Sequence, residues 1–304
     1  MKKLLRWKDK YLPSGRTVVI AIPFAFLLLF FMLPFIVVLK ISFADIEMGM
    51  PPYRDLTEWQ DSVLLIKLNL EHYATILSDD LYAFAYWSSI QIAFYTTLMC
   101  VLIGYPAAYL IARAHPSKRN LLMMAVMLPF WTSYLIRVYA WIGLLKDQGL
   151  INNVLLYLHL IDEPLRMYHS NVGVYIGMVY SYLPFFIMPL YAHLVKMDLT
   201  LLEAAQDLGA KPWRAFATIT LPLSLRGVMA GALLVFIPAV GEYVIPELLG
   251  GADTLMIGRV LWSDFFNNTD WPLASAATCL MVLVLLIPMA LFQRLQSREL
   301  KVRT

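Results

Sequence analysis

The sequence is short of charge and nearly devoid of cysteine. Only 15% of its 304 residues are Asp, Glu, Lys or Arg, whereas 60% are hydrophobic. Soluble domains carry about 25% charged residues and about 45–50% apolar ones, so this composition excludes a soluble globular enzyme and a disordered chain. The two cysteines, Cys100 and Cys279, each lie in a long apolar run, where we expect small core residues and no disulfide. A polytopic membrane protein is what remains.

Motifs for metal binding and for catalysis are also missing. The five histidines are scattered, with no two at ligand spacing on one predicted helix, so we expect no metal site. No Gly-Lys pair follows the glycine spacing of a Walker A loop, so the chain is not expected to hydrolyse ATP itself. The net charge is only +3, which gives no reason to expect a nucleic-acid partner. We therefore expect no enzymatic activity and no cofactor in this chain.

Six apolar stretches are long enough to cross a bilayer. A hydrocarbon core about 30 Å thick needs about 20 helical residues. The stretches predict an all-α, six-span membrane domain over residues 17–293, with spans at about 17–39, 83–112, 120–145, 172–195, 226–249 and 273–293. The first stretch is too long for the apolar region of a signal peptide, and no small-x-small cleavage site follows it, so we expect a retained anchor.

The distribution of basic residues predicts the orientation. Residues 1–16, the two loops that follow the second and fourth spans, the tail at 294–304 and Arg226 at the start of the fifth span together hold 17 of the 24 Lys and Arg residues. Because loops rich in Lys and Arg stay on the cytoplasmic side, both termini are expected to be cytoplasmic. This positive-inside pattern explains the basic clusters, and it leaves the outer face net acidic. For the acidic segment 40–82, a solvated face is the ordinary interpretation, and attraction of a cationic solute or a docking partner is the alternative.

The cytoplasmic segment 196–225 has the pattern of two short helices. Residues 199–208 predict the first, and Gly209 is expected to end it because the residue after a helix commonly needs a positive φ. Pro212 suits the first turn of the second helix, which we expect Pro222 to end before the fifth span. Such a loop could be a surface connector or a docking element.

The spacing in this loop resembles the EAA loop of ABC-importer permeases. The pattern is Glu-Ala-Ala, three residues, Gly, nine residues and Ile-x-Leu-Pro. The matching positions, which the resemblance assigns to coupling with an ATPase, are Glu203, Ala204, Ala205, Gly209, Ile219, Leu221 and Pro222. In that family the loop inserts a helix into a groove on a cytoplasmic ATPase subunit. The resemblance thus implies a type I ABC-importer permease of a bacterial inner membrane.

Other segments are similar to the polyamine (putrescine and spermidine) permeases of that family. They are residues 135–144 (LIRVYAWIGL), 235–251 (VFIPAVGEYVIPELLGG) and 256–276 (MIGRVLWSDFFNNTDWPLASA). This similarity implies a polyamine cargo, a second homologous permease, two cytoplasmic ATPase subunits that bind ATP and Mg²⁺, and a periplasmic binding protein. The rival interpretation is a self-contained secondary transporter or channel for a cationic solute.

Two charges within spans need a reason, because an ionisable residue at the centre of a membrane helix costs about 2.5–3.5 kcal/mol on insertion scales. Glu242 lies 16 residues beyond Arg226, and Arg137 lies 18 residues beyond Arg119. At about 1.5 Å per residue, the two are roughly 24 and 27 Å above the cytoplasmic side. We expect an ion pair between spans three and five, with snorkelling of Arg137 to the outer interface as the alternative.

The fifth span contains several helix-breaking residues, Pro238, Gly241, Pro246 and the pair Gly250-Gly251. Interrupted helices in transporters often mark the substrate pathway. Nearby carboxylates could bind an ammonium group, and aromatic faces could add cation–π contacts. The candidate pathway residues are Glu242, Tyr243, Glu247, Trp262, Asp264 and Trp271. Solvation at the outer interface is the alternative for Glu247 and Asp264.

Overall fold

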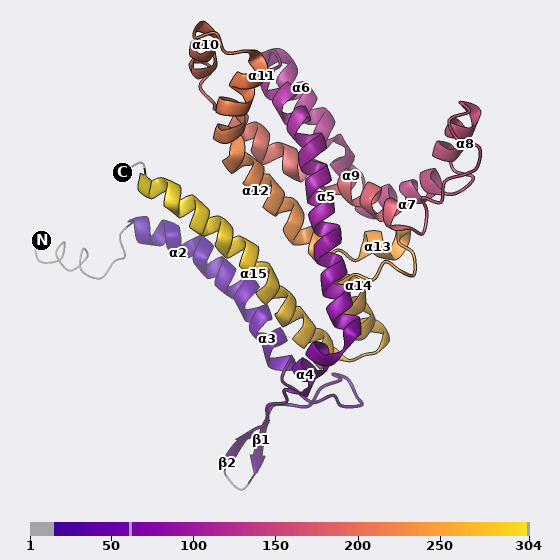
Figure 1. Ribbon diagram of the computed structural model, residues 1–304. Coiled ribbons are helices and arrows are strands. Elements are labelled where there is room, and N and C mark those ends of the chain that lie inside the picture. The colour runs from indigo at the N-terminus through magenta and orange to yellow at the C-terminus, as the bar shows by residue number, and fades with distance from the viewer. Residues whose placement is uncertain (1–14, 61–62, 303–304) are drawn as a thin grey trace, which may run out of the picture. The chain divides into compact units, whose positions relative to one another are not determined.

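The computed structural model describes residues 15–60 and 63–302, which are helical apart from one small β-hairpin and the connecting loops (Figure 1). The predicted all-α class is confirmed for this part of the chain. The chain divides into two compact units, residues 1–78 with 264–280 and residues 79–263 with 281–304. Each unit is described by itself.

The first unit contains one long apolar helix followed by a polar segment. Its elements are α2 (Gly15–Leu27), a π-helical turn (Leu28–Met32), α3 (Leu33–Ile41), β1 (Thr57–Gln60), β2 (Val63–Ile66) and α4 (Glu71–Ser78). The strands pair antiparallel, with Thr57 opposite Ile66. The segment after α3 is tied to α4, since the Ser42 and Tyr73 hydroxyl oxygens lie 2.8 Å apart. Most side chains of the long helix are exposed, as expected of a helix that faces lipid.

The second unit is a bundle in which α5, α9 and α12 make the most extensive contacts with one another. Its helices are α5 (Asp80–Arg113), α6 (Pro116–Met127), α7 (Tyr134–Leu145), α8 (Leu150–Tyr157), α9 (Asn171–Leu194), α10 (Thr200–Asp207), α11 (Pro212–Ala215), α12 (Leu221–Val240), α13 (Val244–Leu249) and α14 (Ile257–Trp262). A 3₁₀ turn (Leu128–Trp131) follows α6, and a π-helical turn (Ser263–Asn267) follows α14. The long α15 (Trp271–Val302) has its first residues in the first unit and the rest in the second.

The centre of this bundle depends on glycines that let helices approach closely. Phe186 of α9 is fully buried between Gly104 of α5 and Gly231 of α12. A Cβ atom at Gly231 would lie only 2.8 Å from the backbone oxygen of Phe186. Small residues at helix contacts are typical of membrane bundles, where close packing replaces the hydrophobic effect as the main attraction between helices.

Five helices in the described residues are long and apolar enough to cross a membrane: Val19–Ile41, Asp80–Arg113, Asn171–Leu194, Pro212–Val240 and Trp271–Arg294. The segments 116–131 and 134–157 pass the same test only together, and they are bent by 90° at the break. If this bent pair is counted as one span, the described residues contain six candidate membrane spans. The single straight helix expected over 120–145 is therefore broken, at Thr132 and Ser133.

Two expectations about the fifth span need correction. Pro222 does not end a helix, because α11, a π-helical turn (Phe216–Thr220) and α12 follow one another without a break. Pro222 closely follows the π-helical turn, and a local π adjustment of this kind lets a membrane helix continue through a proline. The span expected to reach residue 249 instead ends at Val240, and α13 is a separate short helix.

Gly231→Val should destabilise the bundle, since the added side chain would force apart α9 and α12. Overpacking of this kind costs about 1–3 kcal/mol. Gly143→Val is the matched control, because no atom lies within 4 Å of a Cβ built at Gly143. The melting temperature of the purified complex in detergent should fall for Gly231→Val and stay near the wild-type value for Gly143→Val. Equal melting temperatures for the two variants would contradict the packing account.

Candidate functional site

The segment between α9 and α12 folds as two short helices joined at Gly209. α10 spans Thr200–Asp207, close to the predicted range of 199–208. Gly209 has a φ of +80°, which confirms that it ends α10 in a left-handed conformation. No atom lies within 4 Å of a Cβ built there, so backbone conformation is the reason for glycine at this position. α11 then begins at Pro212, as predicted.

One aromatic residue anchors this segment to the bundle. The ring of Phe216 packs edge-on against Tyr105 and Tyr109 of α5, with centroid distances of 5.7 and 5.6 Å. The Tyr105 hydroxyl in turn lies 2.8 Å from the Ser224 hydroxyl of α12. These contacts tie the residues that follow α11 to both α5 and α12.

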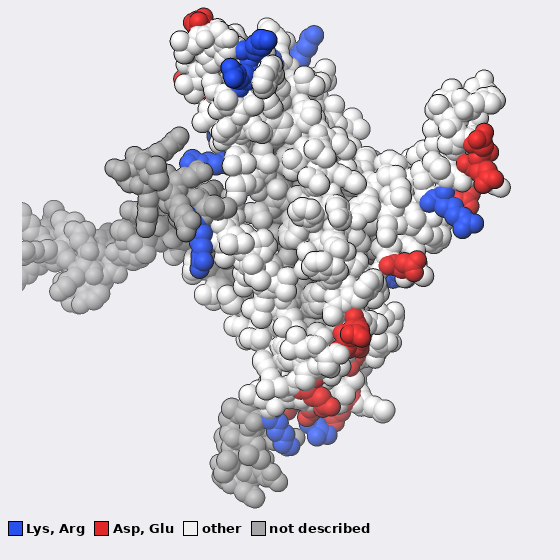
Figure 2. Space-filling model, in the orientation of Figure 1, with Lys and Arg blue, Asp and Glu red and all other residues white. Residues whose placement is uncertain are grey.

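Two large apolar side chains of this segment are exposed. Leu208 is 88% exposed and Trp213 is 67% exposed, although both are large hydrophobic residues. Figure 2 shows basic side chains at the end of the second unit that carries α10 and α11. Seven residues are predicted to couple to an ATPase, and two of them, Ala205 and Ile219, are half-buried. The other five are exposed: Glu203, Ala204, Gly209, Leu221 and Pro222. Exposed apolar residues among charges are the usual composition of a docking surface.

A second feature is the break in the fifth span, where Glu242 caps the following helix. α12 ends at Val240, and α13 starts only at Val244. The Glu242 carboxylate oxygen Oε1 accepts hydrogen bonds from the backbone N–H groups of Val244, at 3.0 Å, and Ile245, at 3.4 Å. The carboxylate thereby satisfies N–H groups that the start of a helix leaves without partners. The interruption inferred from the prolines and glycines of this span is confirmed.

Two tyrosines from other helices complete the surroundings of Glu242. The Tyr134 hydroxyl of α7 donates to Oε1 at 3.0 Å, and the Tyr182 hydroxyl of α9 donates to Oε2. Tyr182 is buried and Tyr134 is half-buried. One carboxylate therefore joins α7, α9 and α13. Nothing in the sequence singled out these two residues among its 17 tyrosines.

The ion pair expected between Arg137 and Glu242 does not form. The Arg137 guanidinium instead lies over the rings of Phe130, at 4.7 Å, and Tyr134, at 5.6 Å. Its Nε and Nη1 atoms are buried without a hydrogen-bond partner. Tyr134 contacts both charges, donating its hydroxyl to Glu242 and presenting its ring to Arg137. The estimated heights along the helices could not show that an aromatic side chain lies between the two residues.

The remaining predicted pathway residues of the second unit form paired contacts between α13 and α14. The rings of Tyr243 and Trp262 stack with centroids 4.4 Å apart. The Glu247 Oε2 atom forms an ion pair with the Arg259 Nε atom at 2.7 Å. Arg259 was not among the predicted residues, although it is the only Lys or Arg between the fifth and sixth apolar stretches of the sequence, a signal that could have identified it.

Asp264 and Trp271 belong to the first unit. Asp264 is buried and accepts a hydrogen bond from the Asn268 side chain at 3.1 Å. Trp271 stacks on Phe265 with a centroid distance of 4.8 Å and lies 6.3 Å from the ring of Tyr53. The structure thus gives both residues partners within their own unit.

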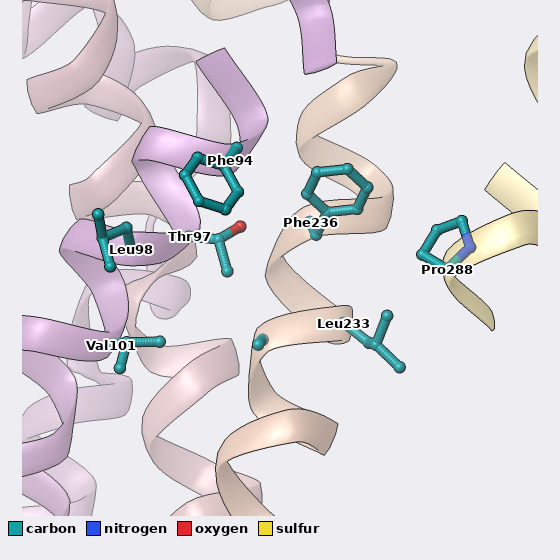
Figure 3. Close-up of a pocket in the computed structure, with 8 residues that line it drawn as sticks. Phe94, Thr97, Leu98, Val101, Leu233, Phe236 and Pro288 are labelled. Carbon is teal, nitrogen blue, oxygen red and sulfur yellow. The ribbon is translucent and has the colours of Figure 1, made fainter. Parts of the chain in front are cut away.

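A cavity of about 320 Å³ lies in the second unit, but its chemistry does not suit a charged solute (Figure 3). It is lined by Phe94, Thr97, Leu98, Val101, Ala232, Leu233, Phe236 and Pro288. The only side-chain polar atom among them, the Thr97 hydroxyl, donates to the Ala93 carbonyl at 2.7 Å. In residues 15–60 and 63–302, no group of three or more His, Cys, Asp or Glu side chains is placed to hold a metal ion.

Comparison with known proteins places the chain among transport proteins. Residues 100–302 match the family described as binding-protein-dependent transport system inner membrane components. The spermidine/putrescine transport system permease protein PotB of Haemophilus influenzae is 38% identical over 274 residues, which are 89% of this chain and 91% of that protein. PotB of Escherichia coli is 37% identical over 268 residues, covering 88% of this chain and 93% of that protein.

A solved structure shares the fold. The bacterial alginate ABC transporter, in complex with an alginate pentasaccharide-bound periplasmic protein, contains a chain that superposes with a TM-score of 0.68. The match covers 96% of this chain and 97% of that chain, at 16% sequence identity. Similarity at this level of identity establishes the architecture and leaves the cargo open.

Tyr182→Phe should destabilise the region around Glu242, because it removes one donor from a carboxylate within the bundle. An unsatisfied buried polar group costs about 1–3 kcal/mol, and more when it is charged. Tyr180→Phe, on the same helix, is the matched control. The melting temperature of the purified complex should fall by at least about 2 °C more for Tyr182→Phe than for Tyr180→Phe. Identical values would show that the Tyr182 hydroxyl does not support Glu242.

Proposed function

The chain belongs to the family of binding-protein-dependent transport system inner membrane components, and we propose that it is the permease subunit of an ATP-driven importer for polyamines. It is a multi-pass protein of the inner membrane. The observation that carries the cargo assignment is the 37–38% identity, over about nine-tenths of the chain, to permeases of spermidine/putrescine systems. Putrescine and spermidine are both candidates.

We further propose that α10 and the turn at Gly209 dock on a cytoplasmic ATPase. The exposed side chains of Leu208 and Trp213 supply apolar contact area, and Glu203 suits the first turn of α10. Docking would involve the residues of the matching pattern, which are Glu203, Ala204, Ala205, Gly209, Ile219, Leu221 and Pro222. Because α11 continues into α12, closure of the ATPase would move the fifth span.

The break after Val240 is the proposed region of the substrate pathway. Backbone that leaves the helical pattern at membrane depth is tolerated only where protein or water surrounds it. Carboxylates and aromatic faces there suit an alkylammonium ion. The side chains proposed to line the pathway are Glu242, Tyr243, Glu247 and Trp262, whereas pathway roles for Asp264 and Trp271, which lie in the first unit, stay separate predictions.

The proposed assembly contains four further kinds of component. A second homologous permease would complete the membrane domain, which lipid surrounds. Two ATPase subunits would bind ATP and Mg²⁺, so this chain needs no cofactor of its own. A periplasmic polyamine-binding protein would dock on the net-acidic outer face, and both termini would be cytoplasmic because 17 of the 24 basic residues lie on that side.

Uptake of radiolabelled putrescine and spermidine into cells that express the complete system tests the proposal. Wild type is compared with a system whose ATPase subunit cannot hydrolyse ATP. We expect uptake of at least one amine that disappears with the inactive ATPase. Uptake that persists without ATP hydrolysis would instead establish a secondary transporter or channel, and the absence of uptake by an assembled complex would refute the polyamine assignment.

Gly209→Val should uncouple ATP hydrolysis from transport. Valine is strained at a φ of +80°, so the turn between α10 and α11 should rearrange while the spans remain intact. Gly209→Asn is the matched control, since asparagine tolerates the left-handed region. Uptake and ATPase activity are measured on the same membranes. Uptake should be lost in the valine variant and largely retained in the asparagine variant, and normal uptake with valine would contradict the docking assignment.

A further inference from the structure

The short helices α13 and α14 face each other through two matched contacts. Tyr243 and Glu247 are four residues apart and therefore lie on one side of α13. Arg259 and Trp262 are three residues apart on one side of α14. The aromatic stack and the ion pair consequently lie next to each other, and we refer to these four residues as the clasp.

The clasp lies directly beside the break in the fifth span. Gly258 lies beside Arg259, and a Cβ atom built on it would lie 2.6 Å from the backbone oxygens of both Gly241 and Glu242. Only glycine allows α14 to approach the interrupted backbone this closely. A change in the clasp must therefore change the surroundings of the break.

The two carboxylates near the break differ in how free they are to bind a ligand. Glu242 already accepts hydrogen bonds from two tyrosine hydroxyls and from the backbone N–H groups that begin α13. Releasing Glu242 would leave those donors without a partner in the protein interior, which is costly. Glu247 has one charged partner, Arg259, and both side chains are partly exposed, at 40% and 33%. Ion pairs with such access to solvent contribute little net stability, so another cation can replace the arginine.

Building on the proposed function, we propose that Arg259 is an internal counter-cation, which a substrate ammonium group displaces from Glu247 during transport. The Glu247 carboxylate keeps a cationic partner throughout the exchange, so no unpaired carboxylate is left where such a charge is expensive. The released Arg259 guanidinium, 33% exposed while paired, takes up water in place of the carboxylate. Release of Arg259 separates α13 from α14 and unstacks Tyr243 from Trp262. Their ring faces then become available to the alkylammonium ion. Arg259 thus determines how strongly the pathway retains its cargo.

Equilibrium binding of radiolabelled putrescine and spermidine to the assembled permease–ATPase complex, without the binding protein, tests this exchange. Arg259→Gln frees the Glu247 carboxylate and should lower the dissociation constant about tenfold. The double variant with Glu247→Gln should lose this gain. Arg259→Lys keeps a cation and should bind close to the wild-type value. Arg166→Gln removes an exposed cation elsewhere in the second unit and is the matched control, with unchanged binding expected.

The direction of the Arg259→Gln effect separates exchange from a purely structural role. A clasp that only holds the helices together would bind polyamine more weakly, or unchanged, once Arg259 is lost, and either result would overturn the proposal. If that variant does not assemble, Glu247→Gln decides the matter, because unchanged polyamine binding in it refutes the exchange. Uptake by the wild-type system is measured in parallel. Its absence refutes the proposed function, whereas normal uptake with no gain in Arg259→Gln refutes the exchange alone.

Discussion

A break in a helix within a bilayer must find hydrogen-bond partners inside the protein, because lipid offers none. In this chain the Glu242 carboxylate meets that requirement. It caps the first N–H groups of α13 and receives hydroxyl groups from α7 and α9, so the break becomes a junction of three helices. Gly258 of α14 packs closely against the backbone of the break, so α14 also belongs to this junction. The arrangement of this half of the second unit therefore depends on one half-buried acceptor and the donors that surround it.

The continuous helix that starts within the segment 196–225 ends at this junction. The segment Pro212–Val240 has 29 residues, which at about 1.5 Å per residue is roughly 43 Å. Phe216 fixes its beginning against α5, and the close contact between Gly231 and Phe186 fixes its middle against α9. With so little freedom along its length, displacement of α10 by an ATPase would reach Glu242 as a movement of the whole helix. In the proposed function, this links ATP hydrolysis to the pathway without a separate relay.

Local backbone rules predicted the segment between α9 and α12 better than they predicted the surroundings of Glu242. The position of Gly209 followed from the requirement for positive φ at a helix end, and that requirement involves only neighbouring residues. The misjudgement of Pro222 had an equally local cause, since the π-helical turn before it lets the helix continue through the proline. The surroundings of Glu242 were beyond such reasoning. Counting residues along two helices gives heights but no rotation about each axis, so it could not place the ring of Tyr134 beside Arg137.

In the proposed function, the pathway opens at the break beside Glu242 when ATP closes the ATPase subunits. The most direct test is the rate at which a membrane-impermeant thiol reagent, added outside, labels Val244→Cys in the assembled complex. The native Cys100 and Cys279 are buried and serve as a background, and Met48→Cys, at a fully exposed site, controls for the reagent. Labelling at position 244 should be several-fold faster with ATP trapped on the complex than without nucleotide, while position 48 reacts equally in both states. Equal rates at position 244 would contradict the account.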